Sequence, residues 1–358
     1  MLVGFNIKPL WDDNKFRGTG VYTDLLFKYL KKRENNNFKL QEFDRDIPKN
    51  ADLIHYPFFD PFFLTLPVVK RQPTIVTVHD LIPLIFPDKF PKGIKGEIKW
   101  RIQKYSLSGA KTIITDSFSS KKDISTLIGL LSNIKVIYLA ANPEMRAIKD
   151  KSFLSNIIKE YNLPNKFLLY VGDINWNKNI YGLLSAFSLL KDKLAMHKEK
   201  LCDPLKLVLV GGAFLNFSID ETRKIQKLIK DLKIENDVIM PGFVENAKLA
   251  AFYSLAVCYI QPSFYEGFGL PVLDALICGC PVVCSKNSSL SEVGGHFVTY
   301  FNPDDIYDMA DKIGTIVEID ASSRRLLILK GIGWANNFSW NKVADDTIKC
   351  YQEAYKNL

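Results

Sequence analysis

Long apolar runs are missing from this sequence. The longest, Leu249 to Ile260, has twelve residues and is interrupted by Tyr253 and Ser254, whereas a membrane-spanning helix needs roughly 18 or more. The opening segment, residues 1–5, lacks the basic flank, the apolar core and the cleavage site of a secretory leader. We therefore predict a cytoplasmic protein without a membrane-spanning helix.

Metal-binding and disulfide patterns are also lacking. The six cysteines lie mostly within apolar runs, and none has the C-x2-C or cysteine–histidine spacing of a zinc site. No DxD-type motif in a suitable context offers carboxylates to a divalent cation. We therefore predict reduced cysteines that pack in the core, no metal site and no cofactor.

The charge balance does not single out a partner. The 47 basic and 39 acidic residues give a net charge of +8, which is compatible with anionic ligands, nucleic acid or an acidic membrane surface. The basic residues are dispersed and no base-stacking module is recognisable, so we predict no nucleic-acid partner. Hydrophobic residues make up 47% of the 358, enough for the cores of two domains.

Short apolar runs alternate with helical patterns along the chain. Because parallel strands need crossover connections, this alternation predicts α/β domains with parallel sheets wrapped by helices. The pattern pauses around residues 142–166 and then restarts. We predict two Rossmann-like domains, over residues 1–163 and 164–335, and a C-terminal helical segment, 336–358, that packs back on the first domain. The expected strands are Leu2–Ile7, Leu53–Tyr56, Thr74–Val78, Thr112–Thr115 and Lys135–Tyr138, then Phe167–Val171, Leu205–Val210, Val238–Met240, Val257–Gln261 and Pro281–Ser285.

The most informative segment follows the strand that ends at residue 261. It reads as a glycine loop, a short helix and another strand, with Pro271 at the helix start and Gly279 just beyond its end. Backbone amides in the first turn of such a helix have no intrahelical partner and form an anion site. Gly267 and Gly269 let a ligand approach the backbone closely. The loop is therefore predicted to bind a diphosphate.

Two carboxylates flank this loop. Glu266 precedes it and Asp274 lies one turn into the helix, with seven residues between them. Carboxylates repel a phosphate but accept hydrogen bonds from the hydroxyls of ribose and a hexose. The pair therefore favours a nucleotide-sugar site. The alternative is that Glu266 is a helix-entry charge stabilised by the helix dipole and Asp274 is a solvated residue.

The run 265–271, together with Asp274 and the segment 279–283, resembles the E-x7-E signature of retaining glycosyltransferases of family 4. The resemblance extends over residues 18–340 and implies the GT-B fold, in which two doubly wound Rossmann-like domains face each other across a cleft. It implies that the N-terminal domain, 1–163, binds the acceptor and that the C-terminal domain, 164–335, binds the nucleotide sugar. It implies metal-independent transfer of a mannose-type or glucose-type hexose from GDP-mannose or a UDP-hexose. The implied acceptor is a glycan or lipid-linked glycan, and the implied setting is cell-surface polysaccharide biosynthesis.

The resemblance also assigns roles to individual residues. It implies that Glu266, His79 and Lys178 are catalytic, with the diphosphate on Lys178 and the glycine loop, ribose on Asp274 and the nucleotide base beside Phe243. The implied donor-binding residues are Gly18, Thr19, Gly20, Asp173, Asn177, Lys178, Phe243, Val244, Glu266, Gly267, Phe268, Gly269, Leu270 and Asp274. Taken from the residues alone, a tight turn at Gly18, a solvated lysine at position 178 and core packing at Phe243 are alternatives.

Two positions depart from the family pattern. Asn177 stands where the family often carries arginine, which removes one cation from the diphosphate site. Asp274 stands where glutamate is common, and its side chain is one methylene shorter. Two other functions stay open, an epimerase and a sensor, and the departures bear on the sensor. A GT-B-type nucleotide-sugar epimerase would need no acceptor, and a non-catalytic nucleotide or glycan sensor would release no nucleoside diphosphate.

The segment from Lys89 to Lys111 combines seven basic residues with apolar and aromatic ones. Such a composition is compatible with a peripheral contact at the inner face of the membrane. The alternative is a solvated helix face that packs one apolar stripe against the core.

Overall fold

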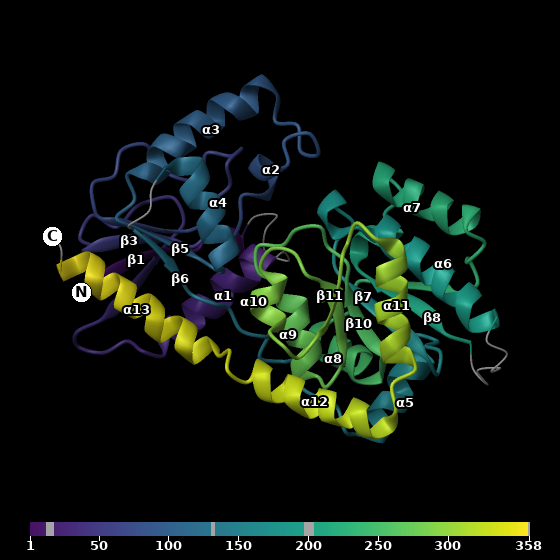
Figure 1. Ribbon diagram of the computed structural model, residues 1–358. Helices are drawn as coiled ribbons and strands as arrows, with labels where there is room; N and C mark the ends of the chain where they lie inside the picture. The colour runs from purple at the N-terminus through teal and green to yellow at the C-terminus, as the bar shows by residue number, and fades with distance from the viewer. Residues whose placement is uncertain (12–17, 130–132, 197–203, 357–358) are drawn as a thin grey trace. The chain divides into compact units, whose positions relative to one another are not determined.

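The computed structural model describes residues 1–11, 18–129, 133–196 and 204–356, which form two compact units (Figure 1). Unit 1 comprises Met1–Ala140 and Phe338–Leu358, and unit 2 comprises Ala141–Asn337. Each unit contains a six-stranded parallel sheet, so the predicted α/β class with two doubly wound domains is confirmed. The boundary predicted after residue 163 lies inside unit 2, because α5 (Lys151–Glu160) packs on α8 (Asn246–Leu255).

The sheet of unit 1 has the strand order β2-β1-β3-β4-β5-β6. Its central strands are buried on both faces, which explains their continuous apolar and β-branched sequences. The strands are β1 (Leu2–Asn6), β2 (Lys39–Phe43), β3 (Leu53–Tyr56), β4 (Thr74–Thr77), β5 (Thr112–Thr115) and β6 (Ile134–Val136). The helices are α1 (Gly18–Lys31), α2 (Ile82–Ile85), α3 (Gly93–Ser108), α4 (Phe118–Ile128) and α13 (Trp340–Lys356).

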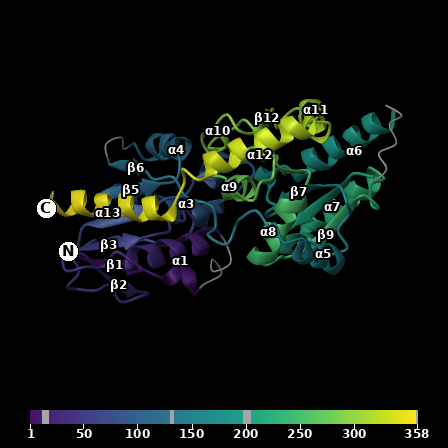
Figure 2. The same cartoon turned by 90° about the horizontal axis from the view of Figure 1, so that it is seen from below.

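The C-terminal helix α13 belongs to unit 1, where it packs on α1 (Figure 2). The ring centroids of Trp340 in α13 and Tyr22 in α1 are 6.2 Å apart. The hydroxyl of Tyr351 lies 2.7 Å from Nδ1 of the buried His55 in β3. Aromatic packing and this buried hydrogen bond therefore fix the last helix to the first sheet.

The sheet of unit 2 has the order β12-β11-β10-β7-β8-β9. Its strands are β7 (Phe167–Val171), β8 (Lys206–Val210), β9 (Val238–Gly242), β10 (Cys258–Gln261), β11 (Val282–Ser285) and β12 (Thr299–Phe301). The remaining helices are α6 (Ile180–Met196), α7 (Asp220–Asp231), α9 (Leu270–Ile277), α10 (Leu290–Gly294), α11 (Ile306–Val317) and α12 (Ala321–Ala335). One core cluster joins this sheet to α6, α7 and α11.

The described cysteines are buried free thiols, and Cys202 lies outside the described residues. Burial raises the pKa of the Cys258 and Cys278 thiols to about 12, which suppresses the reactive thiolate. Among the helices that the structure describes, none is both long and apolar enough to span a membrane.

Candidate functional site

Lys178 and Glu266, 88 residues apart in sequence, form an ion pair in unit 2. Lys178 Nζ donates to both carboxylate oxygens of Glu266, at 2.8 Å to Oε1 and 2.9 Å to Oε2. Lys178 ends the 3-10 turn Trp176–Lys178 after β7, and Glu266 lies in the loop between β10 and α9. The lysine side chain is 22% exposed and the glutamate side chain 10% exposed. Two of the three predicted catalytic residues therefore meet at the carboxyl edge of the sheet.

The Glu266 carboxylate is held by further donors from β10 and the loop after it. Ser263 Oγ donates to Oε1 at 2.6 Å, and Gln261 Nε2 donates to the same oxygen at 2.8 Å. Gln261 in turn accepts a hydrogen bond from the buried Tyr259 hydroxyl. Each of these partners is buried. The network therefore fixes the direction of the carboxylate before any ligand binds.

The turn that carries Lys178 is attached to the Glu266 loop by two asparagines. Asn177 Nδ2 donates to the Tyr265 carbonyl at 3.0 Å, and its own carbonyl accepts from Phe264 N at 2.8 Å. Asn179 adopts a left-handed conformation (φ 52°) and donates to the Pro262 carbonyl at 3.1 Å. The sequence predicts that Asn177 binds the donor in place of a family arginine, but its side-chain amide is committed to the protein backbone.

The glycine loop is positioned by two serines at the start of α10. Glu266 N donates to Ser288 Oγ at 2.9 Å, and Ser289 Oγ lies 2.9 Å from the carbonyls of both Glu266 and Phe268. Gly269 has φ 106° at the N-cap of α9, and a Cβ there would meet Leu290 at 2.6 Å. A residue other than glycine would be strained at this position, because φ lies in the left-handed region and the added Cβ would displace the end of the Leu290 side chain.

Helix α9 has the predicted ends. It begins at Leu270 with Pro271 in its first turn, and Gly279 lies just beyond the C-cap with φ 75°. The helix is therefore confined by glycines in left-handed conformations at both ends. Its first turn directs backbone amides toward the loop that contains Gly267 and Phe268.

Asp274 faces a different partner from Glu266. Its Oδ1 accepts a hydrogen bond from the backbone N of Asn142 at 2.8 Å. Asn142 lies at the N-terminal end of unit 2. Burial raises the pKa of the Asp274 carboxyl to about 7, and the Asn142 amide opposes this only in part. The structure thus brings Lys178 and Glu266 together. One carboxylate oxygen of Asp274 is instead used in a hydrogen bond with a backbone amide.

Three adjacent strands of unit 2 end in glycines: Gly172 after β7, Gly211 after β8 and Gly242 at the end of β9. A Cβ on Gly211 would lie 2.2 Å from the Gly172 carbonyl oxygen, so position 211 has no room for a side chain.

The predicted donor-binding residues next to these glycines differ in solvent exposure. Asp173 is exposed and its Oδ1 accepts from Ile174 N at 2.7 Å. Phe243 is 70% exposed, and Val244 is buried.

The other predicted residues belong to unit 1. Gly18, Thr19 and Gly20 form the first turn of α1, after residues 12–17, which lie outside the described range. Gly18 is exposed, and a Cβ added to it would meet no atom of the described residues within 4 Å, whereas Gly20 is buried. The Thr19 carbonyl accepts from Thr23 Oγ1 at 2.8 Å, which ties the turn to the next one.

His79 follows β4, and its Nδ1 lies 2.6 Å from Oδ2 of the buried Asp116, which follows the neighbouring strand β5. The Tyr22 ring meets the imidazole edge-on, with centroids 4.5 Å apart. Burial alone would lower the pKa of His79, but the Asp116 carboxylate raises it above its ordinary value. Burial raises the pKa of Asp116 in turn. The contact with Asp116 therefore favours the protonated form of the His79 imidazole.

The sequence reasoning missed Asp116, Gln261 and Ser263. A signal for each was present. Asp116 is the first residue after a predicted strand next to the one that precedes His79. Gln261 is polar at the end of an otherwise apolar strand, and Ser263 precedes the glycine loop. Residues at the carboxyl ends of parallel strands converge on one edge, so these positions were candidates in principle.

Two family models match the chain in succession. "Glycosyltransferase Family 4" matches residues 13–145, within the N-terminal half of the chain, and "Glycosyl transferases group 1" matches residues 155–328 in unit 2. Together they span most of the chain, including His79, Lys178 and Glu266.

Relatives agree with these models. O-antigen chain mannosyltransferase B from Escherichia coli is 29% identical over 284 residues, which are 79% of this chain and 71% of that protein. Serotype-specific mannosyltransferase WbdA from Escherichia coli is 27% identical over 76% of this chain, which spans only 32% of WbdA. The structure of Anabaena HepE in complex with UDP-glucose superposes with a TM-score of 0.72 at 16% identity, covering 98% of this chain and 99% of that one. The expected GT-B fold is confirmed, and the two family models together with these relatives show that the chain is a glycosyltransferase.

Proposed function

We propose that this protein transfers a hexose from a nucleoside diphosphate sugar to a hydroxyl of a glycan or lipid-linked glycan in cell-surface polysaccharide biosynthesis. The proposal includes retention of the anomeric configuration and independence of a metal ion. The observation that carries it is the Lys178–Glu266 ion pair beside the first turn of α9. A cation, an acceptor of hydroxyl protons and a helix N-terminus then lie within one loop system.

These groups have complementary tasks in the proposed reaction. The ammonium of Lys178 and the first-turn amides of α9 stabilise the negative charge that develops on the departing diphosphate. When the diphosphate engages Lys178, the Glu266 carboxylate becomes available to accept hydrogen bonds from the hexose. Ser263 and Gln261 keep that carboxylate in place during the exchange. Attack of the acceptor on the face that the diphosphate leaves would give retention.

GDP-mannose is the first donor to test, because relatives of this chain are named as mannosyltransferases of O-antigen chains. A UDP-hexose is the second, because the structurally similar HepE has been crystallised with UDP-glucose. The names of these relatives also support a growing surface polysaccharide as the acceptor. The roles implied for Gly18, Thr19, Gly20 and His79 are part of the same proposal.

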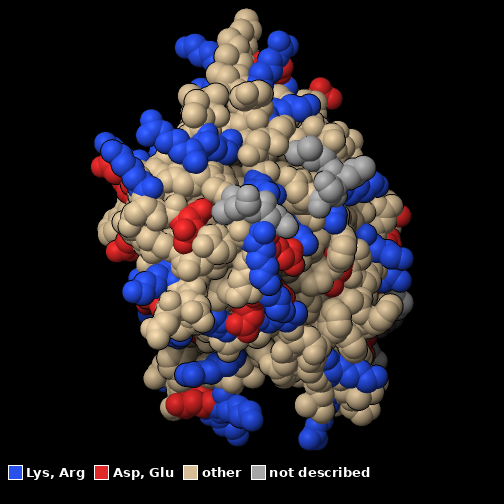
Figure 3. Space-filling view, turned by 90° about the vertical axis from the view of Figure 1, so that its left-hand side faces the viewer, with Lys and Arg blue, Asp and Glu red and all other residues tan. Residues whose placement is uncertain are grey.

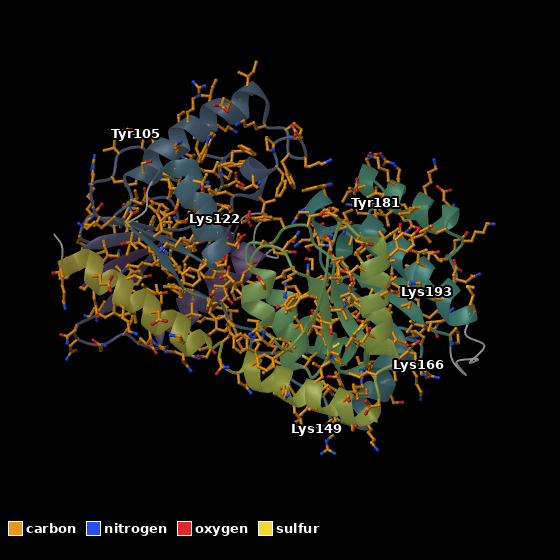
Figure 4. The ribbon with its side chains drawn as sticks, in the orientation of Figure 1. Tyr105, Lys122, Lys149, Lys166, Tyr181 and Lys193 are labelled. Atoms are coloured by element: carbon orange, nitrogen blue, oxygen red, sulfur yellow. The ribbon has the colours of Figure 1, made fainter. Side chains whose placement is uncertain are left out.

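A melting-shift panel of GDP, UDP, dTDP and ADP tests donor binding. A nucleotide present at 100 times its dissociation constant stabilises the folded state by about 2.7 kcal/mol. We expect one nucleotide to raise the melting temperature, and Lys178→Ala to abolish that rise. Lys193→Ala is the matched control, because Lys193 lies on α6 and pairs with Asp311 instead (Figure 4).

Product analysis then tests the reaction. With the selected donor and a glycan acceptor, we expect release of the nucleoside diphosphate together with an α- or β-linkage of the same configuration as the donor. Conversion of the donor sugar without an acceptor would replace the transferase by an epimerase. Nucleotide binding without turnover, in the presence of acceptors of several classes, would favour the non-catalytic sensor over the transferase.

A further inference from the structure

We propose that the face of unit 1 formed by α3 and residues 63–71 binds the surface of an anionic phospholipid membrane. Helix α3 has an apolar stripe on its solvent side. Ile94 is 83% exposed, Ile98 54% and Tyr105 71%. Their spacing places all three on one side of the helix, and Figure 4 shows Tyr105 at the outer end of α3. The stripe faces away from the core.

The opposite side of α3 accounts for the packing of the helix. Gly96, Trp100, Gln103 and Leu107 are buried against the unit. The exposed stripe is therefore not the side that holds α3 in place. Large apolar side chains on the solvent side of a surface helix indicate a contact with another apolar phase or partner.

A second exposed apolar segment lies beside α3. Phe63, Leu64, Val68 and Val69 are all more than half exposed. Lys70 Nζ donates to Ser106 Oγ of α3 at 2.8 Å, which fixes this segment along the helix. Lys99 of α3 lies over the Phe63 ring, with Nζ 5.2 Å from the ring centroid. Residues 63–71 and α3 are thus neighbours, joined by basic side chains from both segments.

The charge of this face selects an anionic occupant. Helix α3 contains Lys95, Lys99, Arg101 and Lys104 against one acid, Glu97, and residues 63–71 add Lys70 and Arg71 without any acid. In Figure 3, which views unit 1 from the side of its termini, Lys and Arg surface is more extensive than Asp and Glu surface. Lysine stems can lie along acyl chains while their ammonium groups reach phosphates. Apolar groups framed by cations match a bilayer interface of anionic lipid.

A basic pocket continues this face beyond Val69. It has a volume of about 660 Å³ and is lined by four basic residues, Arg45, Lys49, Lys70 and Arg71, against one acid, Asp46, together with apolar groups that include Ile47 and Val69. Cations around an apolar wall suit a phosphate-bearing headgroup attached to hydrocarbon. The pocket gives the same face a place for one lipid headgroup, in addition to the general attraction of its charges.

Co-flotation with vesicles tests the proposal without donor or acceptor, so its outcome is independent of the proposed function. We expect the full chain to float with vesicles of phosphatidylcholine and phosphatidylglycerol at low salt, and much less with phosphatidylcholine alone. Each basic residue near an anionic surface contributes about 1 kcal/mol. Lys95→Glu/Lys104→Glu should therefore weaken the vesicle partition coefficient by at least about 30-fold.

A second variant and a matched control complete the test. Ile94→Gln/Ile98→Gln keeps every charge and should still weaken partitioning more than about tenfold, because the apolar stripe no longer inserts. Lys230→Glu/Lys233→Glu makes the same charge change at exposed positions at the end of α7 in unit 2 and should bind as the unchanged protein does. Melting curves verify folding of each variant. Equal binding to both vesicle types, or equal loss in the α7 control, would overturn the proposal.

Discussion

The Lys178 ammonium contacts both carboxylate oxygens of Glu266, at 2.8 Å and 2.9 Å. Each group thus neutralises a charge that is largely removed from water. An anionic ligand that approaches Lys178 competes directly with Glu266 for the ammonium group. Lys178 can therefore change its ion-pair partner from Glu266 to the ligand. The ion pair connects the stability of the loop to the binding of the donor.

Substitution of Glu266 should separate these two effects. Glu266→Ala removes the hydroxyl acceptor and should lower kcat/KM by at least about 1000-fold, as loss of a group that contacts the reacting sugar does. Glu266→Gln keeps the size of the side chain but loses the charge that pairs with Lys178, and its activity should lie between those of Glu266→Ala and the unchanged protein. Steady-state kinetics with the selected donor measure the effect. Glu235→Ala, an exposed control in unit 2, should be unaffected, and near-normal turnover of Glu266→Ala would remove Glu266 from the site.

The His79–Asp116 dyad should be visible in the titration of the histidines. Asp116 raises the pKa of His79 against the effect of burial, so Asp116→Asn should bring that pKa below its ordinary value near 6.5. Because the raised pKa of His79 belongs to the folded state, the contribution of His79 to stability is complete below its unfolded-state pKa near 6.5 and is lost as the pH rises through the folded-state pKa.

Imidazole nitrogen NMR of the four histidines measures this effect directly, with His79→Gln to assign the signal. His55 provides an internal control, since burial lowers its pKa to about 3 and it should stay neutral between pH 5 and 8. An unchanged titration of His79 in Asp116→Asn would show that the carboxylate does not determine the proton position.

Much of the fold follows from the sequence because strand and helix periodicity is strong in the buried elements. All ten expected strands are present within a residue or two. Strands β2 and β12 were not expected, because β2 is a half-exposed edge strand and β12 has only three residues. The predicted domain boundary is too late in the chain, since the amphipathic pattern of α5 says nothing about which sheet it packs on.

The candidate site, like the fold, could be predicted from the sequence only in part. Glu266 and Lys178 could be found from their positions after strands and near helix starts. The commitment of Asn177 to the Tyr265 carbonyl and of Asp274 to Asn142 N could not, because both bonds join segments far apart in the sequence. Local pattern indicates which side chains lie at an edge, but tertiary contacts decide which of them face a ligand.

Asp274 gives a second pH-dependent contribution to stability. Its folded-state pKa is raised from its ordinary value to about 7, so ionisation is easier in the unfolded chain and stability should fall as the pH rises through this window. Asp274→Asn keeps an oxygen for the Asn142 amide without the charge. The variant should melt a few degrees higher than the unchanged protein at pH 8 and at the same temperature at pH 4. Melting curves across this range measure the difference, and a constant difference at all pH values would contradict the raised pKa.

The first turn of α1 offers a test of its implied contact with the donor. Gly18 is exposed, and a Cβ there meets no described atom within 4 Å, so Gly18→Ala should fold normally and gain up to about 1 kcal/mol from reduced chain entropy. If the backbone of this turn lies against the donor, the added methyl group should still lower kcat/KM by about tenfold or more. Gly333→Ala in α12 is the matched control, since a Cβ on Gly333 also has open space among the described residues and the position is helical. The control should gain similar stability and keep full activity, and full activity of Gly18→Ala as well would place the turn away from the donor.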